Sequence, residues 1–237
     1  MKKSPDTSLP PCDLLHEIYA TREVTKPDGT HIQVRDFISP PFAKALYQTV
    51  LARRPALVIE VGMAYGLSAL SILSALRDAG GGRLISIDPA QSTDYAGIGI
   101  LNVRRAGLEA FHELIEAPSF QALPQLLDTG TQLDFAYIDG WHTFDYALLD
   151  FFYVDKMLRQ GGCVAFNDCG WQSVHRVISF VQTHRKYREL DVGLPPDYRG
   201  GSLLSTLVHI FQRRSRSDRY FEKLEPWEPN WNFYRRF

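Results

Sequence analysis

Three patterns follow one another in the segment Ala56-Leu-Val-Ile-Glu-Val-Gly-Met-Ala-Tyr-Gly-Leu-Ser-Ala-Leu70. The first six residues are mostly apolar and β-branched, which is typical of a strand buried on both faces of a parallel sheet. Gly62 and Gly66 bracket a tight turn, and leucines then recur at helical spacing from Leu67. Strand, glycine turn and helix form the first unit of a doubly wound α/β domain. The turn presents backbone N–H groups and the positive end of a helix dipole to a ligand.

The spacing of the two glycines narrows the choice of ligand. A dinucleotide fingerprint requires G-x-G-x-x-G, whereas this turn has Ala64 where the middle glycine would stand. Glu60 lies two residues before the first glycine and suits a ligand with a cationic amine, while the helix N-terminus suits a carboxylate. S-adenosylmethionine carries both groups. The alternative interpretation is a glycine turn that serves only strand–helix packing.

The length, charge and cysteine content limit the kinds of protein that this chain can be. The chain has 237 residues, 45% hydrophobic and 12% aromatic, which fits one large α/β domain. A net charge of −1 predicts no general attraction to nucleic acid or to an anionic membrane, and the basic run at 213–216 is interpreted as a solvated surface. Three cysteines without C-x-x-C spacing favour a reducing, cytoplasmic setting. Neither a signal peptide nor a membrane span is apparent.

Hydrophobic periodicity predicts alternating strands and helices after the first unit. Further strands are expected at 84–88, 113–116, 133–139 and 163–168. Helices are expected at 98–106, 121–127, 144–158 and 174–181, and Gln160-Gly-Gly162 is interpreted as a helix stop. Near the C-terminus, 190–194 is a candidate sixth strand, and 203–211 fits a helix or a strand. Residues 1–37 are expected to form an N-terminal arm or a lid, with a short helix around 14–19, and residues 38–237 the main domain.

Polar side chains end three of these strands. Asp88 ends the second strand, where an acid commonly binds ribose hydroxyls, although a turn aspartate is the alternative. Asp139 ends the fourth strand, and Asn167 and Asp168 end the fifth. We expect these last three at one edge of the sheet, where their hard oxygen ligands suit Mg²⁺ or a similar divalent ion.

Four motifs together resemble one enzyme family. They read Val58-Ile-Glu-Val-Gly, Ser86-Ile-Asp-Pro, Ala136-Tyr-Ile-Asp-Gly-Trp-His and Phe166-Asn-Asp-Cys, and the similarity spans about residues 38–185. They resemble class I S-adenosylmethionine-dependent methyltransferases of the catechol and macrocin O-methyltransferase-like type. The resemblance implies a Rossmann-like, mostly parallel, seven-stranded sheet with helices on both faces. It also implies a last, antiparallel strand, for which 231–237 is the candidate.

The resemblance also implies roles for individual residues. The cofactor would contact Glu60, Gly62, Tyr65, Gly66 and Ser68 around the turn, Asp88, Pro89 and Gln91 after the second strand, Ser119 and Phe120 after the third, and Asp139. The metal ligands would be Asp139, Asn167 and Asp168. The Asn-Asp order departs from the Asp-Asp or Asp-Asn of many relatives.

A second departure concerns the general base. Catechol-type enzymes have a lysine three residues after the aspartate, where this chain has His142. An imidazole that titrates near neutrality can take a hydroxyl proton, so His142, with Asp139, is the predicted catalytic group. Alternatively, His142 is a metal ligand, or it is a loop histidine that forms a hydrogen bond with the backbone. Trp171 follows Asp168 and is expected at the same edge of the sheet. There it would hold a planar or apolar acceptor molecule, or alternatively it would cap the core.

The predicted function is methylation of a small-molecule hydroxyl, with S-adenosylmethionine as the methyl donor and with the help of Mg²⁺ or a similar divalent ion. One alternative is a nicotinamide-dependent oxidoreductase, against which the missing G-x-G-x-x-G argues. The other is a non-catalytic cofactor-binding protein whose metal site has decayed, an interpretation that Asn167 keeps open. The expected partner is a small acceptor molecule, and neither nucleic acid nor a membrane is expected to bind. The sequence does not decide whether the protein forms a homo-oligomer.

Overall fold

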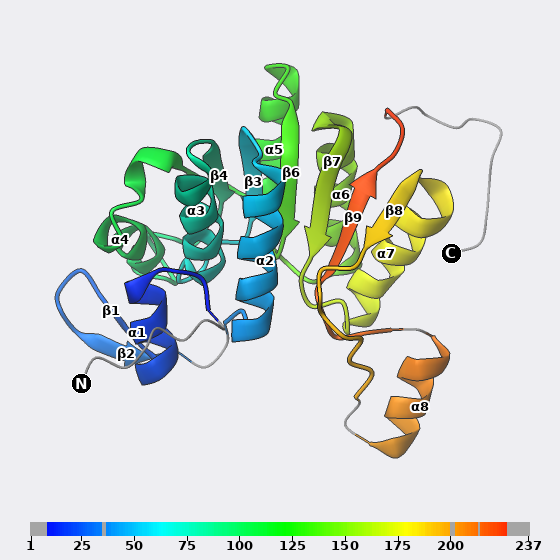
Figure 1. The fold of residues 1–237 in the computed structure, drawn as a ribbon, viewed down its shortest axis with the longest axis horizontal. Helices are drawn as coiled ribbons and strands as arrows, with labels where there is room; N and C mark the ends of the chain where they lie inside the picture. The colour runs from blue at the N-terminus through cyan, green and yellow to red at the C-terminus, as the bar shows by residue number, and fades with distance from the viewer. Residues whose placement is uncertain (1–8, 35–36, 200–201, 213, 227–237) are drawn as a thin grey trace. The chain divides into compact units, whose positions relative to one another are not determined.

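The computed structural model describes residues 9–34, 37–199, 202–212 and 214–226. The chain forms two compact units. The first consists of residues 1–57 and 63–117, and the second of residues 58–62 and 118–237. Figure 1 labels the helices and strands of both units.

Seven strands form one sheet in the order β5-β4-β3-β6-β7-β9-β8. Their bounds are Leu57–Val61 (β3), Arg83–Ile87 (β4), His112–Ile115 (β5), Leu133–Ile138 (β6), Leu158–Phe166 (β7), Tyr187–Leu190 (β8) and Arg219–Lys223 (β9). Strand β9 is antiparallel to both of its neighbours, whereas β3, β6 and β7 pair in parallel, as do β4 and β5. The predicted doubly wound, mostly parallel, seven-stranded α/β fold is confirmed.

The first unit holds β4 and β5 together with the N-terminal elements. These are α1 (Asp13–Thr21), β1 (Glu23–Thr25), β2 (His31–Gln33), α2 (Pro40–Arg53), α3 (Leu67–Ala79), α4 (Ile98–Arg105) and the 3₁₀ turn Glu109–Phe111. Helix α3 begins and ends at glycines, Gly66 and Gly80, that both adopt left-handed φ values. The short helix expected around 14–19 is present as α1, where Leu15 and Ile18 are fully buried.

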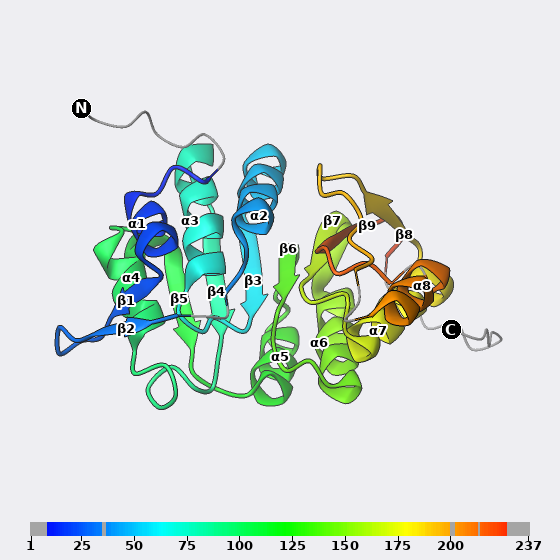
Figure 2. The same ribbon diagram turned by 90° about the horizontal axis from the view of Figure 1, so that it is seen from below.

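The second unit contains β3, β6, β7, β9 and β8. Its helices are α5 (Ser119–Asp128), α6 (Phe144–Met157), α7 (Gln172–His184) and α8 (Leu203–Phe211). Helices α5, α6 and α7 lie side by side along β6 and β7 (Figure 2). Ring contacts join helix to sheet, because Phe151 of α6 meets Phe166 of β7 at 5.9 Å and Phe166 meets Phe221 of β9 at 6.1 Å between centroids. This buried core fixes the edge at which the parallel strands end.

The start of β7 differs from the prediction. Gln160-Gly-Gly162 is not a helix stop, because α6 ends at Met157 and β7 begins at Leu158. The register explains the difference: Leu133 pairs with Leu158 but Phe135 pairs with Cys163, so β7 carries extra residues in a bulge. Gly161 supplies the positive φ, +77°, that the bulge requires.

The C-terminal strands were also misplaced by the sequence patterns. The candidate strand 190–194 overlaps β8 only at Leu190, because Asp191 and its successors form a loop. The antiparallel strand is β9, in which two adjacent residues, Tyr220 and Phe221, are both fully buried. The stretch 231–237, predicted for that role, lies outside the described residues. A buried lysine, Lys223, ends β9 and conceals its strand character in the sequence.

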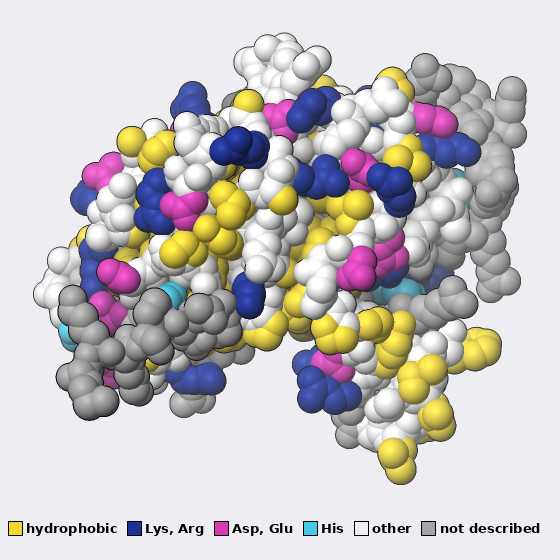
Figure 3. Space-filling model, viewed as in Figure 1, with side chains coloured by type: hydrophobic (Ala, Val, Ile, Leu, Met, Phe, Trp, Pro, Cys, Tyr) yellow, Lys and Arg dark blue, Asp and Glu magenta, His cyan; other side chains and the backbone are white. Residues whose placement is uncertain are grey.

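Helix α8 confirms the helical alternative for 203–211 and exposes most of its apolar side chains (Figure 3). Leu203 is 87% and Phe211 90% exposed, and His209 is the buried residue of this helix. In the described part of the chain, no helix combines the length and the apolar character needed to cross a membrane. Cys12, Cys163 and Cys169 are buried, and none of these three described residues forms a disulfide.

Candidate active site

Four strands of the second unit place polar residues in one row. Val61 pairs with Ile138, Ile138 with Phe166, and Phe166 with Arg219. The residues next to these pairs are Gly62, Asp139 and Asn167, at the carboxyl ends of the parallel strands, and Asp218, just before the antiparallel strand β9. Ligands of open α/β sheets bind outside this edge. The register therefore gathers, at one edge, residues that are up to 156 positions apart in the chain.

Gly62 lets the ends of β3 and β6 approach closely. Its φ is +89°, and the N–H of Asp139 donates to the carbonyl of Val61 at 2.9 Å. A Cβ atom at Gly62 would lie 2.7 Å from the carbonyl carbon of Asp139 and 3.1 Å from the Cα of Gly140. Both the backbone conformation and this contact therefore require glycine at the position that the sequence pattern singled out.

In the first unit, Asp88 holds the glycine turn in place. Its buried carboxylate accepts hydrogen bonds through Oδ2 from the N–H groups of Met63 at 3.0 Å and Ala64 at 2.7 Å. Oδ1 accepts from the N–H of Ala90 at 2.8 Å. Ala64 has a left-handed φ of +49°, which these bonds help to maintain. Asp88 thus positions the turn, and binding of ribose hydroxyls remains a prediction.

Two amide side chains complete this arrangement. Gln91 is buried, and its Nε2 donates to the carbonyl of Ala64 at 2.7 Å and to Oδ2 of Asp88 at 3.1 Å. Asn102 of α4 donates to the carbonyl of Tyr65 at 2.9 Å. The sequence analysis missed Asn102, for which the signal is a polar residue on the apolar face of a predicted helix. Of the other predicted cofactor residues here, Ser68 is buried and Pro89 exposed.

We expect Asp88→Ala to weaken cofactor binding by roughly 1.5–3 kcal/mol, or about 10- to 150-fold. The substitution leaves the N–H groups of Met63 and Ala64 without their carboxylate acceptor, so the turn loses its conformation. Calorimetric titration with S-adenosylhomocysteine measures the loss. The matched control is Asp94→Ala, which removes an exposed acid from the same loop. A folded Asp88→Ala variant with unchanged affinity would remove Asp88 from the cofactor site.

The residues predicted to contact adenine lie at the start of α5 in the second unit. Ser119 is buried, whereas Phe120 is 43% exposed and meets the ring of Tyr146 edge-on at 6.2 Å. The sequence analysis missed Asp150 of α6, a fully buried carboxyl group beside Gly140. Burial raises the pKa of Asp150 to about 6, against a hydrogen bond with Ser119 that lowers it. The sequence signal for Asp150 is an acidic residue on the apolar face of a predicted helix.

Asp139, His142 and Asp168 form the chemical centre of the second unit. Nε2 of His142 lies 2.9 Å from Oδ2 of Asp168 and 3.5 Å from Oδ1 of Asp139. Asp168 adopts a left-handed φ of +50°, an uncommon conformation for an aspartate. The hydroxyl of Ser173 donates to the carbonyl of His142 and so holds the loop against α7. Asp139 and Asp168 thus lie close together, and the third member of this cluster is His142, which was predicted as a catalytic group beside Asp139.

The charges of this cluster depend on one another. Burial raises the pKa of Asp139 to about 6, because it outweighs the favourable interaction with His142. Burial alone would lower the pKa of His142, but its contacts with Asp139 and Asp168 raise it to about 9. These contacts favour the protonated form of His142 at neutral pH. It becomes a proton acceptor only after it has lost that proton.

Asn167 lines a small pocket together with Asp139 and His142, and its role as a metal ligand stays a prediction. Its Nδ2 donates to the hydroxyl of Tyr137 and to Oδ1 of Asp218, both at 3.1 Å. The hydroxyl of Tyr137 donates to Oδ2 of Asp218 at 3.0 Å. Burial, and the negative charge of Asp139, raise the pKa of Asp218 well above its usual value. Asp218 was missed because the strand that follows it was placed at 231–237.

Aromatic side chains surround His142. Trp141 is 70% exposed and Trp171 is 59% exposed. The rings of His142 and Trp171 lie 5.8 Å apart at an interplanar angle of 37°. Because Trp171 is largely exposed, it does not cap the core, and it offers a flat apolar surface beside the cluster.

The stability contributed by His142 should fall as the pH rises. A pKa raised from about 6.5 to about 9 means that the ion pairs contribute fully near pH 6.5, whereas below about pH 6 the pair with Asp139 is lost as that carboxylate takes up a proton. This contribution disappears as the pH passes through 9. In metal-free buffer, the difference in unfolding free energy between the wild type and His142→Gln should therefore shrink from pH 6.5 to 9.5. Urea unfolding at each pH measures this difference, and His31→Gln, at an exposed histidine, is the control. A difference that stays constant with pH would contradict the ion pairing of His142.

The fold and the site can be compared with known proteins. A mostly parallel sheet with a glycine turn after its central strand and an acid after the next strand is typical of doubly wound folds that bind a ligand at the carboxyl edge. Residues 59–169 match the family model described as "Methyltransferase domain". No curated protein matches the chain significantly. Over residues 59–169 the chain is thus similar to a methyltransferase domain.

Solved structures of methyltransferases share this fold. An O-methyltransferase from Bacillus cereus in complex with SAH is 16% identical, with 93% of this chain and 94% of that chain covered and a TM-score of 0.67. TomG from Streptomyces achromogenes, an O-methyltransferase of tomaymycin synthesis solved with SAM, is 17% identical, with 95% and 93% covered and a TM-score of 0.64. SAH-bound PaMTH1 from Podospora anserina is 13% identical, with 94% and 89% covered and a TM-score of 0.64.

Proposed function

We propose that this protein transfers the methyl group of S-adenosylmethionine to a hydroxyl oxygen of a small molecule at the Asp139–His142–Asp168 cluster. The observation that carries the proposal is the position of this cluster. Its first member, Asp139, is the neighbour of Gly62 in the row at the carboxyl edge, and Gly62 begins the glycine turn. The solved O-methyltransferases with SAM or SAH bound support this donor and this type of acceptor atom.

The reaction needs alignment and removal of one proton. The acceptor oxygen attacks the methyl carbon, the carbon–sulfur bond breaks, and the sulfonium becomes a neutral thioether as the hydroxyl proton leaves. Asp139 is the proposed acceptor of that proton, because its raised pKa of about 6 makes it a stronger base than an ordinary carboxylate and leaves it ionised at pH 7. The protonated His142 keeps both carboxylates in place, and the exposed faces of Trp141 and Trp171 would hold the acceptor.

The same cluster fits a divalent cation. Asp139, His142 and Asp168 each offer one ligand atom, and these atoms lie within 4.8 Å of one another. Two carboxylates and an imidazole favour a transition metal such as Mn²⁺ over Mg²⁺, which prefers oxygen ligands. The ion would have to displace the proton of His142. When bound, it would lower the pKa of the acceptor hydroxyl. The Nδ2 of Asn167 donates to Tyr137 and Asp218, so only its Oδ1 could add a ligand to this set.

The proposal is tested by the formation of S-adenosylhomocysteine from S-adenosylmethionine with a panel of small phenols, catechols and hydroxylated metabolites. We expect Asp139→Asn to lower turnover by about 100- to 10,000-fold while cofactor affinity stays near that of the wild type. Asp145→Asn is the matched control, since Asp145 is an exposed acid at the start of α6.

Removing metal ions with a chelator distinguishes a metal-assisted reaction from one that needs only the base. Activity that disappears on exhaustive chelation and returns with Mn²⁺ or Mg²⁺ supports the cation, and unchanged activity rejects it. Asp139→Asn with wild-type turnover would overturn the proposed role of the cluster. Tight cofactor binding without turnover of any acceptor would favour a non-catalytic cofactor-binding protein.

A further inference from the structure

Helix α8 of the second unit turns its apolar side to the solvent and its polar side to its own protein. Three polar residues, Ser205, Thr206 and His209, lie on one side of the helix, and they are half-buried or buried. On the opposite side, spacings of three and four residues bring together six exposed apolar side chains. These six, the apolar face of α8, are Leu203, Leu204, Leu207, Val208, Ile210 and Phe211 (Figure 3).

Local interactions alone do not account for the stability of α8. The hydroxyl of Ser202 caps the helix by accepting a hydrogen bond from the N–H of Ser205 at 3.2 Å. The helix has nine residues, however, and isolated helices shorter than about 12–15 residues are marginal in water. Helices in proteins gain most of their stability by packing an apolar face. Among the described helices and strands, none packs along α8, so its apolar face needs a partner from outside the unit.

The size of the apolar face fits a protein interface. Six such side chains present on the order of 500 Å² of apolar surface, near the upper end of the largest patch on a typical monomer, about 300–600 Å². Each partner in a stable protein–protein interface buries roughly 800 Å². The apolar face thus supplies more than half of one side of such an interface, and its surroundings can supply the rest.

The distribution of charge favours a second copy of this chain over a lipid surface. Helix α8 contains no Lys, Arg, Asp or Glu. A helix that lies on a membrane carries Lys and Arg on its polar face, whereas here that face is uncharged or buried and faces the protein. The cores of homodimer interfaces are apolar and depleted of charge, and their rims are polar. The exposed residues Arg199, before α8, and Arg216, after it, suit such a rim.

We propose that α8 is the docking element of a homodimer, in which the apolar faces of two copies of this chain pack against each other. Two-fold symmetry requires only that a patch be complementary to itself, and an uncharged row of leucines meets this condition. Leu207 is the middle residue of the helix, so it would meet Leu207 of the second copy near the symmetry axis. The inference does not depend on methyl transfer.

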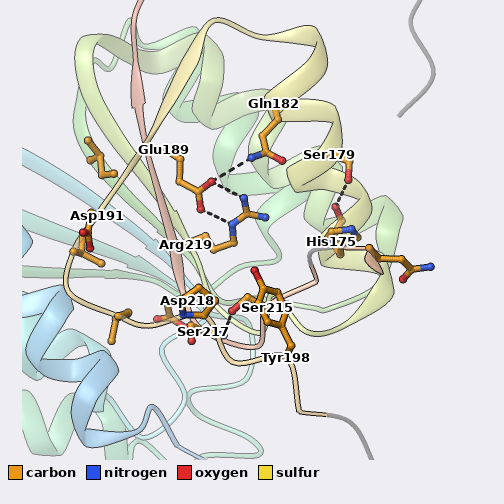
Figure 4. A pocket seen from close by; sticks show the side chains of 15 residues that line it. His175, Ser179, Gln182, Glu189, Asp191, Tyr198, Ser215, Ser217, Asp218 and Arg219 are labelled. Carbon is orange, nitrogen blue, oxygen red and sulfur yellow. Dashed lines mark hydrogen bonds and ion pairs between the residues drawn. The ribbon is translucent and has the colours of Figure 1, made fainter. Parts of the chain in front are cut away.

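Dimerisation would also fix the walls of a cavity. The chain enters and leaves α8 through two segments that line a cavity of about 400 Å³, in which Figure 4 labels Tyr198 before the helix and Ser215 after it. Asp218 belongs to the same lining and accepts a hydrogen bond from Asn167 at the carboxyl edge of the sheet. A second copy seated on α8 would therefore hold both of these segments beside that edge.

The test is light scattering coupled to size-exclusion chromatography of the full chain over a range of concentrations. We expect a mass of twice 27.0 kDa for the wild type. Leu207→Glu and Leu207→Lys should each weaken the dimer at least about 100-fold, because like charges then face each other across the axis. An equimolar mixture of the two variants should regain the dimer, since opposite charges meet. Leu224→Glu, at an exposed leucine outside α8, is the matched control and should remain dimeric.

Cross-linking provides a second measurement. Mild oxidation should join two copies of Leu207→Cys by a disulfide but not two copies of Leu224→Cys, and the native cysteines Cys12, Cys163 and Cys169 are buried. A wild type of 27.0 kDa at every concentration, or a dimer that persists unchanged in Leu207→Glu and Leu207→Lys, would overturn the proposal. A monomeric wild type that sediments with vesicles of anionic phospholipid would assign the apolar face to a membrane instead, which also overturns it.

Discussion

Replacing Gly62 with alanine should lower the affinity for S-adenosylmethionine at least about 100-fold, equivalent to roughly 2.7 kcal/mol. The new Cβ atom would lie 2.7 Å from the carbonyl carbon of Asp139, so the backbone after β3 or after β6 has to move. The φ of +89° adds conformational strain for any residue with a side chain. Since Asp139 is itself displaced, the cofactor turn and the acid cluster are both disturbed. Calorimetric titration with S-adenosylmethionine and S-adenosylhomocysteine measures the loss.

The matched control is another glycine with a positive φ. Gly130 follows α5 with a φ of +74°, and a Cβ atom there would meet nothing within 4 Å. Gly130→Ala should cost about 1 kcal/mol of stability through strain and leave cofactor affinity unchanged. If Gly62→Ala binds the cofactor like the wild type and keeps a native circular dichroism spectrum, the turn is not the cofactor site.

Asp155→Ala should lower the free energy of unfolding by about 3–5 kcal/mol, because it leaves buried cations without their counter-charge. Asp155 of α6 is 1% exposed and bonds to Nε of Arg185 at 2.7 Å and to the hydroxyl of Tyr187 at 2.6 Å. The ammonium of Lys223, also buried, lies 3.2 Å from Oδ1 of Asp155 and donates to the carbonyl of Leu158. This network joins α6 to β8 and β9, so its loss loosens the strands that carry Asp218. Urea unfolding measures the effect.

A variant at an exposed ion pair tests whether burial causes the large loss of stability expected for Asp155→Ala. Glu113 accepts from Arg83 at 2.6 Å, but both side chains are largely exposed, so Glu113→Ala should cost no more than about 1 kcal/mol. Equal losses in Asp155→Ala and Glu113→Ala would show that the buried network contributes nothing beyond an ordinary surface pair. A double substitution of Asp155 and Lys223 would then measure the coupling between the two charges.

Local sequence determined the framework of this protein. The buried run before Gly62, the positive φ values of Gly62 and Gly66, and the leucine spacing of α3 all depend on residues a few positions apart, so the first strand–turn–helix unit could be predicted. Asp139 and Asp168 were found for a similar reason. Each ends a strand with a clear apolar pattern, and parallel strands end at one edge of a sheet.

Only the tertiary structure decided the partners and the charges of the site. Asn167 and Tyr137 bond to Asp218, which reaches this edge only because β9 lies between β7 and β8. The raised pKa of His142 results from Asp168, 26 positions away in the chain, as well as from Asp139 nearby. Periodicity reports which face of an element is apolar, but hydrogen bonds and ion pairs depend on distances between residues remote in sequence. Those distances exist only once the strands are in register.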